Sequence, residues 1–266
     1  MDTPYQVIPD IEILPAHFQV PGAGYLPVNA FVIKAKEPVL IDTGMGIDNK
    51  TFMSALESII DPKELRWIWI THDDADHTGS LQMILKAAPM ARIAIYSLAM
   101  LRISSAWPIP LDRVHWLNPG DAINAGDRYL KAVRPPLFDN PTTIGLYDEN
   151  TKTLFSADCF GSIIPSPAKN VEELEKEYVP EGITNWASLD NPWVHFIKSD
   201  KFKETLDSIR NLAPETILSS HLPPAQGRTE QLLKILESVP DSPPSIAPNQ
   251  NALEQILGES KEKSKA

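Results

Sequence analysis

Cysteine is almost absent from this sequence, because Cys159 is the only one among 266 residues. A single thiol cannot close an internal disulfide, and it cannot supply the cysteine clusters that hold zinc, rubredoxin-type iron or iron–sulfur centres. We therefore expect a protein of a reducing compartment, the cytoplasm, in which Cys159 is a small core residue.

Basic residues and glycine are also scarce. The chain has 24 Lys and Arg against 35 Asp and Glu, a net charge of −11, and no basic cluster that could follow a phosphate backbone. Nucleic acid is therefore excluded as an expected partner. The 12 glycines form no phosphate-binding loop, which argues against a nucleotide site. No run of 18 apolar residues and no signal-like N-terminus occurs, so no membrane association is expected.

The chain does contain a repeated alternation of short strand-like runs and helical segments. The first half predicts strands at 6–14, 29–33, 38–41, 67–70 and 93–96. The second half predicts strands at 129–133, 143–147, 153–156 and 216–218, with helices near 202–209 and 232–236. An α/β protein with two sheets, each covered by helices, is the economical packing for this pattern.

The composition changes near residue 240, where the chain becomes rich in Pro and Ser. We expect one folded domain over residues 1–240. Residues 241–266 are expected to contain one short amphipathic helix and a solvated tail at 259–265.

Metal-ligand side chains are concentrated directly after the apolar run 67–70. The segment reads Thr71-His72-Asp73-Asp74-Ala75-Asp76-His77-Thr78-Gly79. In an extended strand exit, side chains two apart point the same way, so His72, Asp74 and Asp76 can face one pocket. His77 turns in as the next helix begins. A helix cap would explain one aspartate but not this whole set, and imidazole and carboxylate ligands predict a two-metal site.

These residues resemble the metallo-β-lactamase superfamily, and within it the oxygen-binding di-iron domain of flavodiiron proteins. The resemblance covers about residues 5–238 and is carried by His72-x-Asp74-x-Asp76-His77-x-Gly79-Ser80, by Asp42-Thr43, by Ser156-Ala157-Asp158-Cys159-Phe160-Gly161 and by Ser220-His221. It implies an αβ/βα four-layer sandwich, the metallo-β-lactamase fold, with two metal ions at the sheet edges.

The resemblance also implies a ligand for each position. His72 and Asp74 would bind the first metal. Asp76 would bind the second metal, with His77 beside it either ligating or turned aside. Asp158 would bridge the two ions, and His221 would complete the second site.

One ligand position departs from the family pattern. Asp139, in Leu137-Phe138-Asp139-Asn140-Pro141-Thr142, lies where the family has a histidine before a Trp-Pro pair. Either Asp139 ligates through oxygen or the first metal is weakly held, and we favour ligation because a carboxylate is compatible with iron.

A few aromatic and histidine side chains have weaker assignments. His17 lies about where similar di-iron domains carry a pocket histidine and is a candidate catalytic residue. His115 and His195 are expected to be structural or exposed, and Trp186 and Trp193 to pack rather than to wall the pocket.

The charges in this ligand set favour a pair of cations. With the histidines neutral, the ionised carboxylates of Asp74, Asp76, Asp139 and Asp158 carry four negative charges, which two divalent ions would neutralise. Oxygen-rich coordination favours iron, with manganese and zinc as alternatives. The metal-loaded form should therefore be more stable than the metal-free form.

Two functions stay open from the sequence. The first is a di-iron protein that binds, senses or reduces a diatomic such as O2 or NO, with electrons from a separate donor protein because no flavodoxin-like segment follows residue 240. The second is a metal-dependent hydrolase in which a bridging hydroxide attacks an ester, lactone or thioester. Both act on a small molecule, and a homodimer is expected from the resembling proteins. A scaffold used only for protein contacts is disfavoured by the full ligand set.

Overall fold

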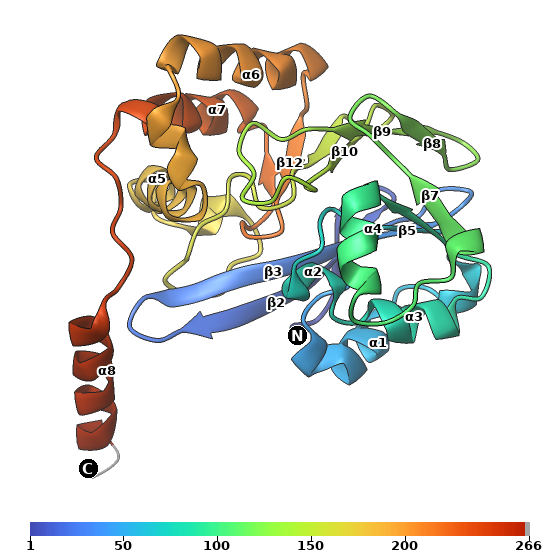
Figure 1. Ribbon diagram of the computed structural model, residues 1–266, viewed down its shortest axis with the longest axis horizontal. Helices are drawn as coiled ribbons and strands as arrows, with labels where there is room; N and C mark the ends of the chain where they lie inside the picture. The colour runs from blue at the N-terminus through green and yellow to red at the C-terminus, as the bar shows by residue number, and fades with distance from the viewer. Residues whose placement is uncertain (264–266) are drawn as a thin grey trace.

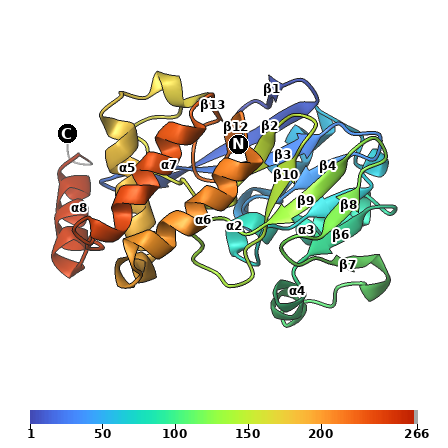
Figure 2. The same cartoon turned by 90° about the horizontal axis from the view of Figure 1, so that it is seen from above.

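Two β-sheets face each other in the computed structural model, which describes residues 1–263 (Figures 1 and 2). The first sheet has seven strands in sequence order. They are β1 (Tyr5–Ile8), β2 (Ile11–Val20), β3 (Gly24–Ile33), β4 (Val39–Ile41), β5 (Trp67–Trp69), β6 (Arg92–Ile95) and β7 (Val114–Trp116). Strands β1 to β4 pair antiparallel, and β4 to β7 pair parallel.

The second sheet has six strands in the order β13-β12-β11-β10-β9-β8. They are β8 (Ala122–Asn124), β9 (Tyr129–Val133), β10 (Gly145–Asp148), β11 (Thr153–Phe155), β12 (Thr216–Leu218) and β13 (Ala225–Gln226). Only β11 and β12 pair parallel; the other neighbours are antiparallel.

Helices cover the outer face of each sheet. The helices α1 (Asn49–Glu57), α3 (Leu81–Ala87) and α4 (Ser97–Ser104) share one apolar core with the first sheet. The helices α5 (Tyr178–Asp190), α6 (Ser199–Leu212) and α7 (Thr229–Ser238) share another with the second sheet. A third core, which includes Phe31, Trp69 and Phe155, lies between the sheets. The predicted αβ/βα four-layer sandwich is therefore confirmed.

Shorter helical segments connect these layers. The one-turn helix α2 (Ala75–Thr78) follows β5, and 3-10 helices occur at Gly46–Asp48, Pro62–Glu64, Leu111–Arg113, Val171–Glu173, Pro192–Phe196 and Val239–Asp241. No helix among residues 1–263 is both long enough and apolar enough to span a bilayer.

The structure differs from the predicted elements in several places, and α4, β7, β8 and β13 were not predicted. The run 6–14 is not one strand, because the chain turns at Asp10, which has a left-handed φ of 66°, and β2 folds back on β1. Helix α5 was not predicted, and it contains Gly182, a residue type that disfavours a helix interior. Gly182 instead permits close packing, since a Cβ there would lie 2.2 Å from Oγ of Ser162.

The last helix, α8 (Gln250–Lys263), lies beside the tip of the β2–β3 hairpin, away from the cores of both sheets (Figure 1). A Cβ on Gly22 of that tip would lie 3.2 Å from the side chain of Ile256. The helix extends through much of the predicted tail, and residues 264–266 of that tail lie outside the described residues. The domain boundary at residue 240 stays a prediction.

Candidate metal centre

The carboxyl ends of several strands meet at one edge of the two sheets. Asp42 follows β4, His72 follows β5, Asp158 follows β11 and His221 follows β12. Clefts at the carboxyl ends of strands are the usual ligand sites of α/β proteins. The fold therefore brings together segments that lie far apart in the sequence.

Asp158 lies at the centre of this cluster. Its Oδ2 is 3.3 Å from Nε2 of His72, and its Oδ1 is 3.1 Å from Nε2 of His77 and 3.2 Å from Nε2 of His221. All four residues are buried. Three imidazoles thus direct the same ring nitrogen at one carboxylate.

The other ring nitrogen of each histidine, Nδ1, contacts a polar group outside the cluster. Nδ1 of His77 lies 2.8 Å from Oδ2 of Asp42, and Nδ1 of His221 lies 2.7 Å from the carbonyl oxygen of Pro27. Nδ1 of His72 lies 3.1 Å from the hydroxyl of Thr71. Hydrogen bonds of this kind fix the orientation of a metal-binding imidazole and keep its Nε2 free for the metal.

The donor atoms form neighbouring groups in which all atoms lie within 4.8 Å of one another. One group consists of His72, Asp74 and Asp139, and another consists of Asp76, His77 and His221. Asp158 forms a third group with His72 and His77 and so connects the two sets. All seven predicted ligands therefore lie in one cluster, His77 points into it rather than away, and the division resembles the two-metal arrangement implied by the sequence.

Buried polar atoms that lack hydrogen bonds support a bound cation. Nε2 of His72, Nε2 of His77 and Oδ1 of Asp158 are inaccessible to solvent and have no hydrogen-bond partner. Such atoms are costly to bury unless something binds them. The donor set therefore fits metal ions, which these nitrogen and oxygen atoms would coordinate.

The cluster shifts the pKa values of its own members. Burial alone would raise the pKa of Asp158, but His221, His72 and His77 hold it well below its usual range. Burial would lower the pKa of His221, yet Asp158 raises it to about 9. Burial would likewise lower the pKa of His77, but Asp158, Asp42 and Asp76 together raise it well above normal. The electrostatic coupling is thus centred on Asp158.

Asp74 and Asp139 lie at the solvent side of the cluster. Asp74 occupies the N-cap position of α2, but its side chain makes no capping hydrogen bond. Its Oδ1 instead accepts a hydrogen bond of 3.0 Å from the amide of Asn140. Asp139 is exposed, yet desolvation of its carboxylate raises its pKa to about 6. The charge of His72 opposes this rise, and the charge of Asp158 adds to it. Helix capping therefore does not account for Asp74.

His17 does not join the cluster. Its Nδ1 lies 2.7 Å from Oδ2 of Asp2. The chain near the N-terminus runs beside β2, where the backbone N–H of Asp2 donates to the carbonyl oxygen of Pro15. His17 also lines a separate cavity that includes Tyr5 and Lys169. A catalytic role for His17 has no support in these contacts.

The remaining cysteine, tryptophan and histidine side chains divide between packing and the site. Cys159 is buried in the core beneath α5 and α6, and burial raises its pKa to about 12. Trp193 packs against Phe138. Trp186 differs from the expectation, because its ring lies 5.1 Å from the ring of His221 and it helps to wall the cluster. The ring of His115 packs edge-on against Trp67, and Nε2 of His195 forms a hydrogen bond with Oγ of Ser188.

Sequence reasoning missed one carboxylate of the site, Asp190. It is the last residue of α5 and offers an oxygen within 4.8 Å of donor atoms of Asp139 and Asp158. Burial, and then the charges of Asp158 and Asp139, raise its pKa to about 7. No sequence signal marked Asp190, because it lies outside every segment that carries the family resemblance.

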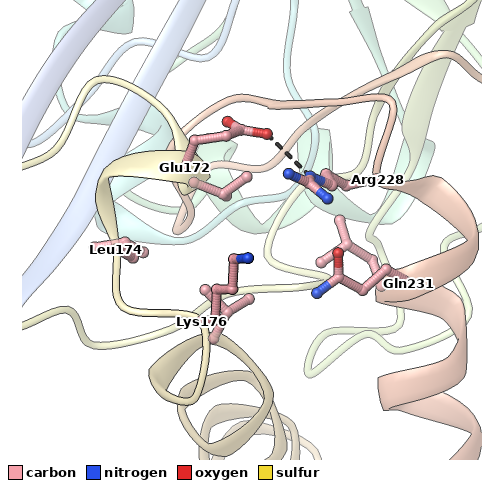
Figure 3. A pocket seen from close by; sticks show the side chains of 8 residues that line it. Glu172, Leu174, Lys176, Arg228 and Gln231 are labelled. Carbon is pink, nitrogen blue, oxygen red and sulfur yellow. Dashed lines mark hydrogen bonds and ion pairs between the residues drawn. The ribbon is translucent and has the colours of Figure 1, made fainter.

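A separate cavity of about 270 Å³ lies between α7 and the segment before α5 (Figure 3). Apolar side chains such as Leu174 line it together with the polar side chains of Glu172, Lys176, Arg228 and Gln231 (Figure 3). Arg228 and Glu172 form an ion pair of 3.0 Å there. No member of the metal-ligand cluster lines this cavity, so the cavity is distinct from the candidate metal centre.

Comparisons with known proteins agree with this fold. The family model described as ODP family beta lactamase matches residues 26–221. An uncharacterized protein of Methanocaldococcus jannaschii is 27% identical over 197 residues, which are 73% of this chain and 48% of that protein. A rubredoxin-oxygen oxidoreductase of Megalodesulfovibrio gigas is 24% identical over 211 residues, with the same coverage of 73% and 48%.

Solved structures show the same architecture. The flavodiiron protein of Giardia intestinalis superimposes with a TM-score of 0.79 at 15% identity, over 90% of this chain and 60% of that chain. The similarity to flavodiiron proteins predicted from the sequence is thus confirmed. The chain spans about half the length of the curated relatives from Methanocaldococcus jannaschii and Megalodesulfovibrio gigas.

Proposed function

This chain belongs to the ODP β-lactamase family, and from that premise we propose that it is a di-iron protein that binds or reduces a small diatomic such as O2 or NO. The convergence of three buried Nε2 atoms on the carboxylate of Asp158 carries the proposal. A relative named rubredoxin-oxygen oxidoreductase supports the same reaction class. Asp74 and Asp139 add oxygen donors, which favour iron over the zinc of histidine-rich hydrolase sites.

The residues of the cluster would divide the work between two positions. His72, Asp74 and Asp139 would hold the first ion, and Asp76, His77 and His221 would hold the second, with Asp158 shared between them. Two iron ions, when bound, would carry electrons from a donor to the diatomic molecule. Asp42, Thr71 and the carbonyl of Pro27 keep the three imidazoles in place, so the site needs little rearrangement on binding.

Trp186 would limit the space beside the second position. Its ring packs against His221, and its indole Nε1 is buried with no hydrogen-bond partner. A wall of this kind suits a small ligand and shields the His221 side of the cluster from bulk water.

The proposed reaction needs an electron source, which we propose to be a separate donor protein. A homodimer and a cytoplasmic location are proposed on the same footing, from the family resemblance and from the single cysteine.

The decisive experiment starts from protein made in iron-supplied cells. Elemental analysis should find two iron ions per chain, and anaerobic reduction followed by exposure to O2 or NO should change the visible spectrum and consume the gas. Asp76→Ala should lose both effects, whereas Asp112→Ala, an exposed aspartate in a 3-10 helix, should retain them.

The same experiment also tests the competing hydrolase function. Protein that holds no iron, shows no spectral change, and hydrolyses an ester or lactone panel in a manner abolished by Asp76→Ala would replace the di-iron proposal.

A further inference from the structure

The side chain of Asp190 lies in an electrostatically unfavourable position. It ends helix α5, and the C-terminal end of a helix carries partial negative charge that disfavours a carboxylate. It also lies beside the carboxylates of Asp139 and Asp158, within 4.8 Å between donor atoms. Like charges this close raise the free energy of the ionised state.

No Lys or Arg side chain compensates for this placement, and the imidazoles of His221 and His72 offset it only in part. Among the described residues, no Lys or Arg forms an ion pair with Asp190. Its Oδ2 accepts one hydrogen bond, of 2.9 Å, from the side-chain amide of Asn191. Burial without a charged partner is costly for a carboxylate, so a bound cation would stabilise the ionised side chain of Asp190.

A second observation points to a ligand at the same place. Nε2 of His72 is fully buried and has no hydrogen-bond partner, and it faces Oδ2 of Asp158 at 3.3 Å. Asp139 and Asp158 each belong to a group that contains His72, and both belong to the group that contains Asp190. The unsatisfied nitrogen of His72 and the carboxylate of Asp190 thus lie in two adjoining groups that share Asp139.

Resting on the proposed function, we propose that Asp190 is an additional oxygen ligand of the first metal position and makes that position select hard cations. The first position then has one imidazole, from His72, and the carboxylates of Asp74, Asp139, Asp158 and Asp190. The second has two imidazoles, from His77 and His221, and the carboxylates of Asp76 and Asp158.

Unequal donor sets give the two positions unequal metal preferences. Carboxylate oxygen suits Mn²⁺ and Fe²⁺, whereas added imidazole nitrogen increasingly favours Zn²⁺. Removing the carboxylate of Asp190 should therefore weaken the first position, weaken it more for Mn²⁺ than for Zn²⁺, and leave the second position intact.

The test is metal titration of the full chain, stripped with chelator and titrated separately with Mn²⁺ and with Zn²⁺. Bound metal is counted by elemental analysis, and free Mn²⁺ is followed by electron paramagnetic resonance. Wild-type protein should bind two ions. In Asp190→Ala the affinity of one ion should fall at least about tenfold for Mn²⁺ and by less for Zn²⁺, and Asp190→Glu should recover part of it.

Controls separate this inference from the proposed function. Glu181→Gln changes an exposed carboxylate on the same helix and should titrate like wild type. Asp190→Asn preserves the size of the side chain and decides the question if Asp190→Ala does not fold. Wild-type protein that binds no metal would refute the two-metal proposal itself. Wild-type protein that binds two ions, together with Asp190 variants of unchanged affinity and selectivity, would overturn only the role of Asp190.

Discussion

Oδ2 of Asp42 lies 2.8 Å from Nδ1 of His77 and 2.8 Å from the hydroxyl of Thr71, while its Oδ1 accepts the backbone N–H of Thr71. Asp42 has a left-handed φ of 57°, a conformation that places its side chain at the end of β4 beside the neighbouring strand exit. One buried carboxylate thus connects two parallel strands and orients an imidazole of the cluster.

Asp42→Asn should weaken metal binding without removing any proposed ligand. The amide keeps the size of the side chain but loses the charge that holds the Nδ1–H of His77, so we expect a loss of affinity of about 10- to 100-fold. Metal titration of the purified variant measures it. Asp48→Asn, at a cap position without a side-chain hydrogen bond, serves as the control. Equal affinities for both variants would show that Asp42 does not orient His77.

Removal of metal should lower the stability of the protein. Two cations relieve the mutual repulsion of the carboxylates around Asp158, and a ligand at 100 times its dissociation constant stabilises the folded state by roughly 2.7 kcal/mol. For a chain of this size the melting temperature should therefore fall by roughly 5 to 10 °C on chelation. Calorimetry with and without chelator provides the measurement, and identical melting temperatures would contradict the expectation.

The stability of the chelated protein should depend on pH in the direction set by its histidines. Folding raises the pKa of His221 from 6.5 to about 9, and those of His77 and His72 in the same direction. The stabilisation is complete below pH 6.5 and is lost as pH rises through about 9. His221 alone would contribute roughly 3 kcal/mol at most.

Urea unfolding in chelator at pH 6 and pH 9.5 tests this loss. The decrease should be smaller in His221→Asn and preserved in His115→Asn. Metal affinity should change in the opposite direction and rise with pH, because the cations displace protons from the imidazoles. A chelated protein that becomes more stable as the solution is made alkaline would refute the coupling to Asp158.

Gly79→Ala should disrupt the cluster through the backbone. A Cβ on Gly79 would lie 2.0 Å from the nitrogen of Gly46 and 2.4 Å from the carbonyl carbon of Met45. These are main-chain atoms, so α2 must shift relative to the loop after β4, and His77 shifts with it. We expect a destabilisation of roughly 3 kcal/mol and loss of metal.

Chemical denaturation and elemental analysis measure these two effects. Gly258→Ala is the control, because a Cβ at Gly258 meets nothing within 4 Å. It should leave metal content unchanged and stabilise α8 by up to about 1 kcal/mol. If Gly79→Ala retained both its stability and its metal, the close contact between α2 and the loop would have no role in building the site.

The sequence by itself determined the local parts of this protein. Hydrophobic patterning indicated most strands and the layered α/β fold. A strand with one buried face has alternating apolar residues, and a strand with two buried faces has a continuous apolar run. The exit of β5 carries four proposed ligands within six residues, so His72 to His77 could be recognised without a structure.

Only the tertiary structure decided which distant side chains meet. His17 was expected near the site, but the pairing of the N-terminal segment with β2 gives it Asp2 as a partner. Asp190 was missed because tertiary packing sets the position of its helix, as in the close approach of Gly182 to Ser162, and no local pattern encodes that packing. Long-range packing places donor atoms of Asp190 and Asp158 within 4.8 Å of each other, and the spacing of these residues in the sequence does not indicate that distance.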